Sequence, residues 1–333
     1  MLLNNYYIFQ KIIQRIKWKW HDLRCAFGFG KSLTTKKKRD VILVYHGIDA
    51  IGSTAYNTRF ISEAMFEKQV AYFAQNTHVL SLDDFFLERF SPNKINLALT
   101  FDDGYQNNLT RALPILEKYK VPATFFITCI HSLNQKVLWP DMIDLAVPYL
   151  PKEIDILGIC FQKGSKNQLL AKETGENVKQ FLQKKSQAEI ELVLSQLNTD
   201  YPFPLNAYHP DYYQTLTDLE IKFLGQNPLI TIGAHGVFHT DLTVLSEQEC
   251  LNELQKSKDY LEKLIQKEVS AIAFPFGTYN EKVLKAAEKV GFTQLMALDK
   301  IGNISHPQMR ERFGVNPFIS YQNQILAIIE GKY

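Results

Sequence analysis

Two pairs of residues in this sequence could bind a metal ion and do acid–base chemistry, and each pair begins where a run of strand-forming residues ends. Asp102 and Asp103 follow LALTF, while His235 follows LITIGA and His239 lies four residues later. One Asp with two His forms a ligand set for a divalent metal that leaves positions open for water and substrate. The metal would neutralise one carboxylate, and the other would stay free beside it as a general base.

Two further segments place chemically useful residues after predicted strands. His46 follows VILVY, and the sequence PFG, which begins at Pro275, follows AIAF. The carboxyl ends of parallel strands form the edge of an α/β barrel at which active sites are built. An Asp pair alone is more typical of a turn, and two His at this spacing are often found on a surface helix. Because four segments place such residues at the end of a predicted strand, together they indicate one site.

The elements that must position these residues alternate between strand and helix. Strands are predicted at residues 41–48, 95–101 and 228–235, and helices at 61–76 and 246–266. This alternation predicts a parallel sheet covered by helices.

One long segment interrupts the alternation. Residues from about 131 to 228 are rich in Lys, Gln, Asn and Glu and contain helix-like stretches, so we interpret them as a helical insertion. The predicted domain organisation is therefore an N-terminal extension at 1–39 and one α/β domain at 40–333 that carries this insertion.

The composition is typical of a globular protein. With 333 residues, 46% of them hydrophobic and 22% charged, the chain is long enough for a sizeable core. A formal net charge of +2 gives no reason to expect nucleic acid as a partner. The four cysteines have no CxxC spacing, and no apolar run reaches the ~18 residues of a membrane span.

The first 39 residues combine an apolar helical stripe with positive charge. The stripe recurs at steps of three and four residues and comprises Ile8, Ile12, Ile16, Trp20, Leu23 and Phe27. Ten Lys or Arg residues and one acid, Asp22, lie between Lys11 and Arg39. This pattern suits a helix in the interface of an anionic membrane, and equally a helix packed on the protein's own core. No signal peptide is apparent, so we expect a cytoplasmic protein, peripheral on the inner face of the membrane.

Three segments resemble the motifs of the polysaccharide deacetylase superfamily, the NodB-homology or carbohydrate esterase family 4 group. They are LTFDDGYQNNLTRALPILEKYKVPATFFI, AHGVFHTDLTVLS and AIAFPFGTYN, in the family's order. The resemblance implies a distorted (β/α) barrel, similar to a TIM barrel but with fewer than eight regular units. It also implies a hydrolase of non-peptide C–N bonds that removes N-acetyl groups, sometimes O-acetyl groups, from glycans.

Carried over residue by residue, the resemblance makes Asp102 the catalytic base and Asp103, His235 and His239 the ligands of one divalent metal. Zn²⁺ is the first candidate, with Co²⁺, Ni²⁺ or Mn²⁺ as alternatives. Metal-bound water would attack the acetamide carbonyl, and the backbone N–H of Tyr105 would help to hold the oxyanion.

The sequence departs from the commoner family pattern in two places. No late Leu-x-His supplies an acid, but VYHGI resembles the start of the subgroup of biofilm poly-N-acetylglucosamine deacetylases, which makes His46 the candidate acid. A neighbouring carboxylate is expected to raise the pKa of His46. The third motif lacks its usual Arg beside Pro275, and Arg310 or Arg312 could replace it in orienting the base.

Several interpretations stay open at this point. Trp139, in a segment that resembles glycan-locus deacetylases, is either a sugar-stacking platform or a helix anchor. The substrate is an N-acetylated glycan, or a lipid-linked or nucleotide-linked sugar. The alternative functions are an O-deacetylase, an amidase on a non-sugar C–N bond, and a non-catalytic glycan-binding protein.

Overall fold

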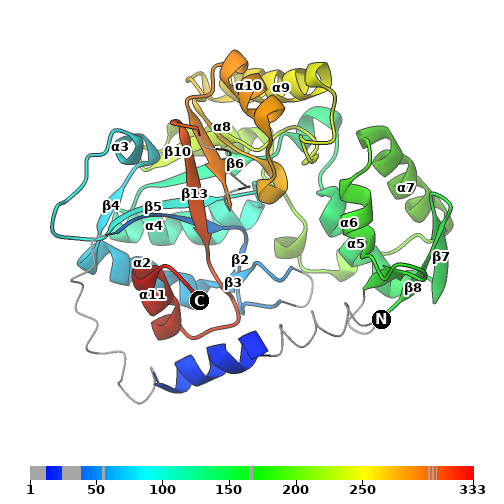
Figure 1. Cartoon of the computed structure of the whole chain (residues 1–333), viewed down its shortest axis with the longest axis horizontal. Helices are drawn as coiled ribbons and strands as arrows, with labels where there is room; N and C mark the ends of the chain where they lie inside the picture. Colours follow the sequence, from blue (N-terminus) through cyan, green and yellow to red (C-terminus); the bar gives the residue numbers. More distant parts are fainter. Residues whose placement is uncertain are drawn as a thin grey trace.

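A closed barrel of seven parallel strands forms the body of the part of the chain that the structure, a computed structural model, describes (Figure 1). The described residues are 13–24, 39–54, 57–164, 168–298, 301, 304 and 306–333. The barrel strands are β1 (Asp40–Tyr45), β5 (Asn96–Phe101), β6 (Ala123–Ile127), β10 (Ile230–Ala234), β11 (Ala271–Ala273), β12 (Gln294–Ala297) and β13 (Met309–Gly314). The sheet order β1–β13–β12–β11–β10–β6–β5 closes because β5 also pairs with β1. The prediction of a barrel with fewer than eight regular units is confirmed.

The barrel is distorted at β5. One edge of this strand pairs with β1 along its whole length. The other edge is divided, because β4 (His78–Leu80) pairs with its first half and β6 with its last two residues. A further short parallel pair, β2 (Ile48–Asp49) and β3 (Ile61–Ser62), lies in the loop after β1.

Helices cover the outside of the barrel. They are α2 (Glu63–Asn76), α3 (Leu82–Phe86), α4 (Leu113–Tyr119), α8 (Asp218–Gln226), α9 (Glu247–Ile265), α10 (Glu281–Val290) and α11 (Tyr321–Glu330). Alternate strand residues such as Leu43, Leu99 and Phe125 face these helices and form the largest hydrophobic core. Two of these helices begin with side-chain caps: Ser62 accepts a hydrogen bond from Met65 N at the start of α2, and a capping box opens α9.

Short helical turns connect the larger elements. The 3₁₀ turns are Ile130–Leu133, Val147–Tyr149, Leu205–Ala207, Pro210–Tyr212 and Pro275–Gly277, and Asn108–Ala112 is a π-helical turn.

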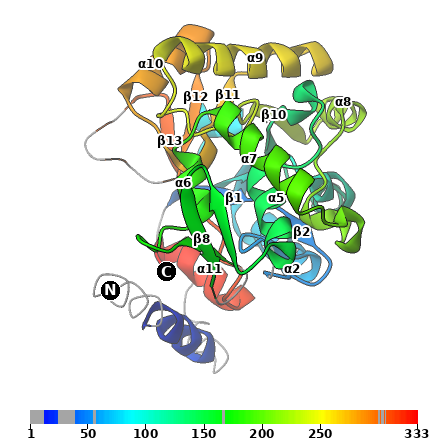
Figure 2. The same cartoon turned by 90° about the vertical axis from the view of Figure 1, so that its right-hand side faces the viewer.

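The segment between β6 and β10 contains more than the helices that its composition suggested. Helices α5 (Trp139–Ala146), α6 (Val178–Gln183) and α7 (Gln187–Asp200) pack with a three-stranded antiparallel sheet, formed by β7 (Glu153–Ile156), β8 (Ile159–Lys163) and β9 (Leu169–Ala171). They share a separate hydrophobic core and lie to one side of the barrel, drawn in green in Figures 1 and 2. The expectation of a purely helical insertion is therefore wrong.

The turn between β7 and β8 explains why the sequence did not predict this sheet. The β7–β8 hairpin turns at Leu157 and Gly158, both of which have positive φ. A two-residue turn of this kind normally contains Asn-Gly or Asp-Gly, and a Leu gives no such signal. The last helix before β10, α8, packs on the barrel, so the insertion core ends before the predicted boundary.

The N-terminal helix, residues 13–24, lies beside α11 and the C-terminus (Figures 1 and 2). Of the predicted apolar stripe, Ile8, Ile12 and Phe27 lie outside the described residues. Among the helices that the structure describes, none is long and apolar enough to cross a membrane.

Phe126 packs against small residues in the barrel interior. It is fully buried with Ala98, Ala271 and Ala273, in a cluster that also contains Ile42 and Met296. A Cβ atom added at Gly233 would lie 2.5 Å from the Phe126 ring, so only glycine fits there. Close packing around Phe126 therefore fills this part of the interior.

Substitution of Gly233 tests this packing. We expect Gly233→Ala to lower the free energy of unfolding by ~1–3 kcal/mol, because the added methyl group overpacks the interior. Denaturant unfolding measures the change. Gly314→Ala is the matched control, since a Cβ at Gly314 meets no atom within 4 Å and its backbone is not left-handed. Equal stability of the two variants would contradict the description of the interior.

Candidate active site

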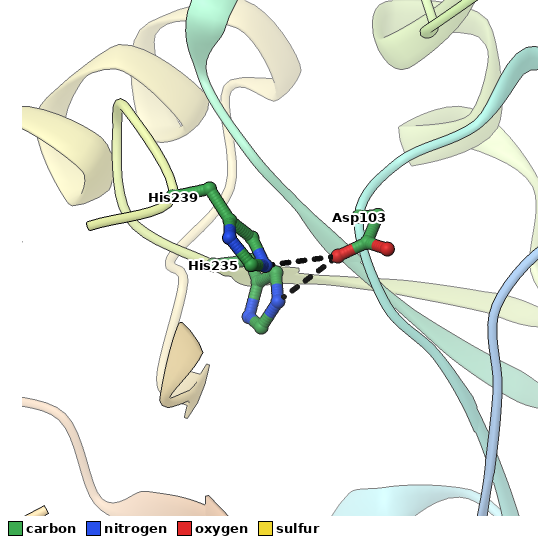
Figure 3. A group of neighbouring side chains, drawn as sticks. All are labelled: Asp103, His235 and His239. Atoms are coloured by element: carbon green, nitrogen blue, oxygen red, sulfur yellow. Dashed lines mark ion pairs between the residues drawn. The ribbon is translucent and has the colours of Figure 1, made fainter. Parts of the chain in front are cut away.

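Three predicted ligands converge at the carboxyl end of the barrel (Figure 3). Asp103 follows β5, His235 follows β10, and His239 lies on the loop beyond it. The Nε2 atoms of His235 and His239 lie 3.3 and 3.2 Å from Asp103 Oδ1. All three residues are buried, and neither carboxylate oxygen of Asp103 accepts a hydrogen bond within the described part of the chain. Buried acceptors without donors are costly, and a divalent cation at this point would satisfy them.

Neighbouring groups orient the His235 imidazole and hold the loop that carries His239. His235 Nδ1–H donates to the carbonyl of Ala273 at 2.8 Å, which leaves the Nε2 lone pair directed at Asp103. The loop that carries His239 is held by Glu253, whose Oε1 accepts from Val237 N at 2.7 Å and Phe238 N at 3.0 Å. The residues present thus fit a metal with two neutral imidazole ligands and one carboxylate.

Asp102 points to a different partner from its neighbour. Both of its oxygens accept from Arg312 of β13, Oδ1 from Nη1 at 2.6 Å and Oδ2 from Nη2 at 2.7 Å. Arg312 Nη1 also donates to Thr100 Oγ1 at 3.2 Å. The second candidate, Arg310, does not reach the site: it stacks over Phe86 and donates to the carbonyl of Pro307. The structure therefore pairs Arg312, and not Arg310, with the predicted base.

Comparison with known proteins agrees with this geometry. A family model described as polysaccharide deacetylase matches residues 91–224 and 153–295, which together span more than half of the chain. The chain belongs to the polysaccharide deacetylase family. The overlap between the two matched ranges falls in the insertion, which separates the Asp102 and Asp103 segment from the His235 and His239 segment.

Individual deacetylase relatives are distant. YxkH of Bacillus subtilis (strain 168), assigned by name to the polysaccharide deacetylases, is 22% identical over 263 residues. The match covers 78% of this chain and 64% of YxkH, so this chain spans less than two thirds of that protein.

Solved deacetylase structures share the barrel. The Streptococcus pyogenes deacetylase PplD superposes with a TM-score of 0.56 at 19% identity, over 87% of this chain and 98% of that one. IcaB from Ammonifex degensii gives a TM-score of 0.52 at 15% identity, over 88% and 98%. At these identities the likeness shows the fold, and the site must be argued from its own residues.

The two carboxylates of the site stay ionised by different means. Burial alone would raise the pKa of Asp103, but Arg59 and the two imidazoles outweigh it and hold that pKa well below its ordinary value. Burial would likewise raise the pKa of Asp102, but Arg312 and His235 lower it below its ordinary value. Both aspartates are therefore already ionised. Neither must lose a proton before it binds a metal ion or accepts a proton from water.

The pKa values of the two imidazoles shift in opposite directions. Burial would lower the pKa of His235, but Asp102 and Asp103 outweigh it, and this pKa is raised. Burial, with help from His235 and Arg59, lowers the pKa of His239. In the metal-free protein His235 is therefore the ligand for which protons compete most strongly.

His46 lies among these charged groups, but the expected pKa shift is wrong. Burial, with help from Arg59 and Arg312, lowers the pKa of His46 to about 3, and Asp103 and Asp102 only partly oppose this shift. Burial and two guanidinium groups, none of which the sequence could place at His46, reverse the sign of the prediction. The imidazole is neutral at physiological pH.

Tyr105 is buried behind the two aspartates. Its hydroxyl donates to Asp141 Oδ2 at 2.7 Å and accepts from Asn57 Nδ2 at 3.0 Å. Within the described chain its backbone N–H has no hydrogen-bond acceptor, so it is free to donate to a ligand. Burial raises the pKa of Asp141 to about 7, against the opposing effects of Tyr105 and Arg59.

Trp139 and Pro275 support the site from behind. Trp139 is fully buried, and its Nε1 donates to the carbonyl of His239 at 3.1 Å. The sugar-platform interpretation is therefore wrong, and Trp139 is the helix anchor. Pro275 is also buried and packs near Gly236 on the loop between the two histidines.

Sequence reasoning missed Arg59. This residue lies in the loop before β3, with its Nη2 atom 3.4 Å from Asp103 Oδ2 and its side chain 40% exposed. Nothing in the segment NTRF repeats a strand-end pattern, and only the barrel closure brings it to the site. The only indication of Arg59 in the sequence was the Asp pair itself, because two carboxylates need more positive charge than Arg312 alone supplies.

The raised pKa of His235 predicts how metal binding depends on pH. Protons compete for His235 below its pKa, while His239 stays neutral, so the apparent dissociation constant should rise about tenfold per pH unit on acidification. Competition titration with a chelating dye between pH 8 and 5.5 measures it. A slope of two protons would show that His239 titrates as well, and a flat profile would exclude His235 as a ligand.

Proposed function

We propose that this protein is a metal-dependent hydrolase that removes N-acetyl groups from an N-acetylated glycan or glycoconjugate. The observation that carries the proposal is the convergence of Asp103, His235 and His239 on one point beside Asp102, which Arg312 holds in place. These five residues come from β13 and from the ends of two other strands, β5 and β10, of one barrel.

The three ligands would hold one divalent ion, with Zn²⁺ as the first candidate. When bound, such an ion polarises a carbonyl oxygen and lowers the pKa of a water molecule. The donor set of two imidazoles and one carboxylate also suits Co²⁺, Ni²⁺ or Mn²⁺.

The remaining residues would manage protons and charge. Asp102, kept ionised by Arg312, accepts the proton of the attacking water through a lone pair that the guanidinium leaves free. The Tyr105 N–H donates to the oxygen of the acetamide as negative charge develops there. The C–N bond then breaks, acetate leaves, and the amine takes up a proton.

His46 is the candidate donor of that proton. Because its imidazole is neutral in the free site, it can donate only after it has taken up the proton that Asp102 removes from the attacking water. Burial, with help from Arg59 and Arg312, keeps the His46 imidazole neutral, which favours rapid release of that proton.

Substitution of the base tests the function. Asp102→Asn should retain metal and lower turnover by ~10²–10⁴-fold, the usual contribution of a general base. Acetate release from chitooligosaccharides, poly-N-acetylglucosamine and nucleotide-linked sugars provides the assay, with metal content measured in parallel. Asp103→Asn is the matched variant and should lose metal. Full activity of metal-free wild-type protein would refute the mechanism, and binding of glycan without acetate release would favour a non-catalytic role.

Substitution of His46 separates proton donation from positioning. His46→Ala should keep its metal and lose turnover on an N-acetyl sugar, because the amine needs a proton to leave. An aryl acetate has a leaving group that needs none, so its hydrolysis should fall much less. Equal losses on both substrates would show that His46 positions the substrate and does not donate.

We also propose that the N-terminal helix contacts an anionic membrane surface, on its cytoplasmic side. The helix is fixed to the barrel by one face: Asp22 Oδ1 accepts from Ser320 N and from Asn323 Nδ2, both at 2.9 Å. The carbonyl of Trp18 also accepts from Asn323 Nδ2 at 3.3 Å.

The opposite face of the helix carries the apolar stripe. Ile16, Trp20 and Leu23 are 61%, 56% and 57% exposed, so these residues do not pack on the protein's own core. The basic residues Lys17 and Lys19 lie between them in sequence. Exposed Trp and aliphatic side chains with Lys and Arg suit an interface that contains anionic lipid.

Vesicle flotation tests this contact. Trp20→Ser with Leu23→Ser should abolish binding to vesicles of phosphatidylglycerol and phosphatidylcholine at low salt, and should leave hydrolysis of a soluble substrate unchanged. Leu219→Ser is the control, since Leu219 is 80% exposed on α8, away from this helix. If the wild-type protein does not float with these vesicles, the membrane proposal is wrong.

A further inference from the structure

Two adjacent asparagines hold the backbone segment that carries His46. Asn108 Nδ2 donates to the carbonyl of His46 at 2.7 Å. Asn107 Oδ1 accepts from Ile48 N at 3.1 Å. Asn108 Nδ2 also donates to Asn107 Oδ1 at 3.4 Å, which joins the two side chains. Both asparagines are buried, so the asparagine pair, Asn107 and Asn108, binds the backbone on both sides of Gly47 without competition from water.

The asparagine pair continues the contact between β1 and β5 beyond the end of their ladder. That ladder ends with the hydrogen bond from Asp102 N to the carbonyl of Tyr45, at 3.0 Å, and His46 is the next residue of the chain. The chain after β5 then returns to His46 through the two asparagine side chains. The proposed base, Asp102, and the side chains that hold the proposed proton donor therefore belong to one continuous segment, residues 102–108.

The imidazole of His46 depends on its backbone for its position. Within the described part of the chain it has no hydrogen-bonding partner of its own, whereas the His235 imidazole is held by the carbonyl of Ala273. The His46 backbone is confined on another side by Phe60, because a Cβ atom added at Gly47 would lie 2.2 Å from the Phe60 ring. Loss of the asparagine pair would therefore remove the fixed position of the imidazole.

The burial of Asn108 is not explained by stability alone. Its Oδ1 atom is buried and accepts no hydrogen bond within the described chain, an arrangement that destabilises the fold. The turn that begins at Asn108 is π-helical, a rare form that is frequent at functional sites. Asn107 is itself fixed, because its Nδ2 donates to the carbonyl of Asp211 at 3.0 Å. A buried amide that costs stability and binds the backbone of a proposed proton donor indicates a role in positioning.

We propose that Asn107 and Asn108 are positioning residues that hold His46 where it can donate a proton to the leaving amine. The inference rests on the proposed function and deepens it, because the asparagine pair acts through His46. The segment 102–108 then fixes both the group that takes a proton from water and the group that returns one to the amine.

Paired substrates test the inference. Asn108→Ala should lower turnover of an N-acetyl sugar about tenfold or more, because misplacement of a catalytic group by about 1 Å can cost about 10²-fold. Hydrolysis of an aryl acetate, whose leaving group needs no proton, should fall less than about threefold, with metal content unchanged. Asn107→Ala should give the same difference, and it answers the question if Asn108→Ala does not fold. Equal losses on both substrates, or full activity of both variants, would overturn the inference.

A double-mutant cycle separates an effect through His46 from a general effect on the fold. In the His46→Ala background, Asn108→Ala should change turnover by less than about twofold, because the group that it positions is already absent. A further loss as large as in the wild type would show that Asn108 does not act through His46.

Asn96 provides the matched control, at the amino end of the same strand. It is also buried, and its Nδ2 donates to Asp40 Oδ1 at 2.8 Å. Asn96→Ala should leave the ratio of the two rates as in the wild type. A change in that ratio as large as for Asn108→Ala would show that any lost buried amide produces it, and would overturn the inference.

Nuclear magnetic resonance separates this inference from the proposed function, since it needs no turnover. In protein with isotope-labelled histidine, the ring signal of His46 is assigned by its loss in His46→Ala. Asn108→Ala should shift or broaden that signal, and Asn96→Ala should not. An unchanged His46 signal would refute the role of the asparagine pair alone. A changed signal in a protein that releases no acetate would refute the deacetylase, since the asparagine pair would still hold His46.

Discussion

Two adjacent carboxylates, fully buried at the end of one strand, are the constraint on which the site depends. An unpaired charge in such a position costs several kcal/mol, so each aspartate needs its own compensation. Asp102 obtains it from the bidentate guanidinium of Arg312, and Asp103 from Arg59 with two imidazoles. Because neighbouring residues point to opposite sides of the backbone, Arg312 cannot pair with Asp103, and Arg59 cannot replace Arg312 at Asp102.

This constraint couples the pairing of Asp102 to closure of the barrel. Arg312 belongs to β13, the last strand of the barrel in sequence, which pairs with β1, the first. Asp102 lies at the end of β5, the other neighbour of β1. The ion pair therefore joins the two strands that flank β1, so a barrel that opens at β1 would lose it.

Backbone strain is also present at this place. Asp103, His239 and Phe276 all have positive φ, which costs residues other than glycine about 1–3 kcal/mol each. Glu253 and Trp139 fix the loop before and at His239, and so they hold a conformation that the chain alone would not adopt. The surrounding fold stabilises the ligand geometry before any metal is bound.

The sequence alone predicted the features that depend on the local pattern of apolar and polar residues. The parallel sheet, and the positions of Asp102, Asp103, His235 and His239, follow from strand ends, because polar residues after an apolar run are visible in the sequence. The barrel was implied by the family resemblance. Arg59 and Asp141 could not be found in this way, since loops and a short helix place them and no periodicity marks them. The pKa of His46 was predicted with the wrong sign for the same reason: its sign depends on burial and on guanidinium groups that only the tertiary structure brings together.

The insertion is part of the site, because it holds the loop that carries His239. Phe238, between the two histidine ligands, lies in the hydrophobic core of the insertion, whereas Val237 beside it lies in the core of the barrel. Trp139 of α5 binds the carbonyl of His239, and Gln183 of α6 binds Asp241 on the same loop. The loop that carries the second imidazole is thus packed between two cores. Any ligand that shifts α5 or α6 would therefore also act on the loop that carries His239.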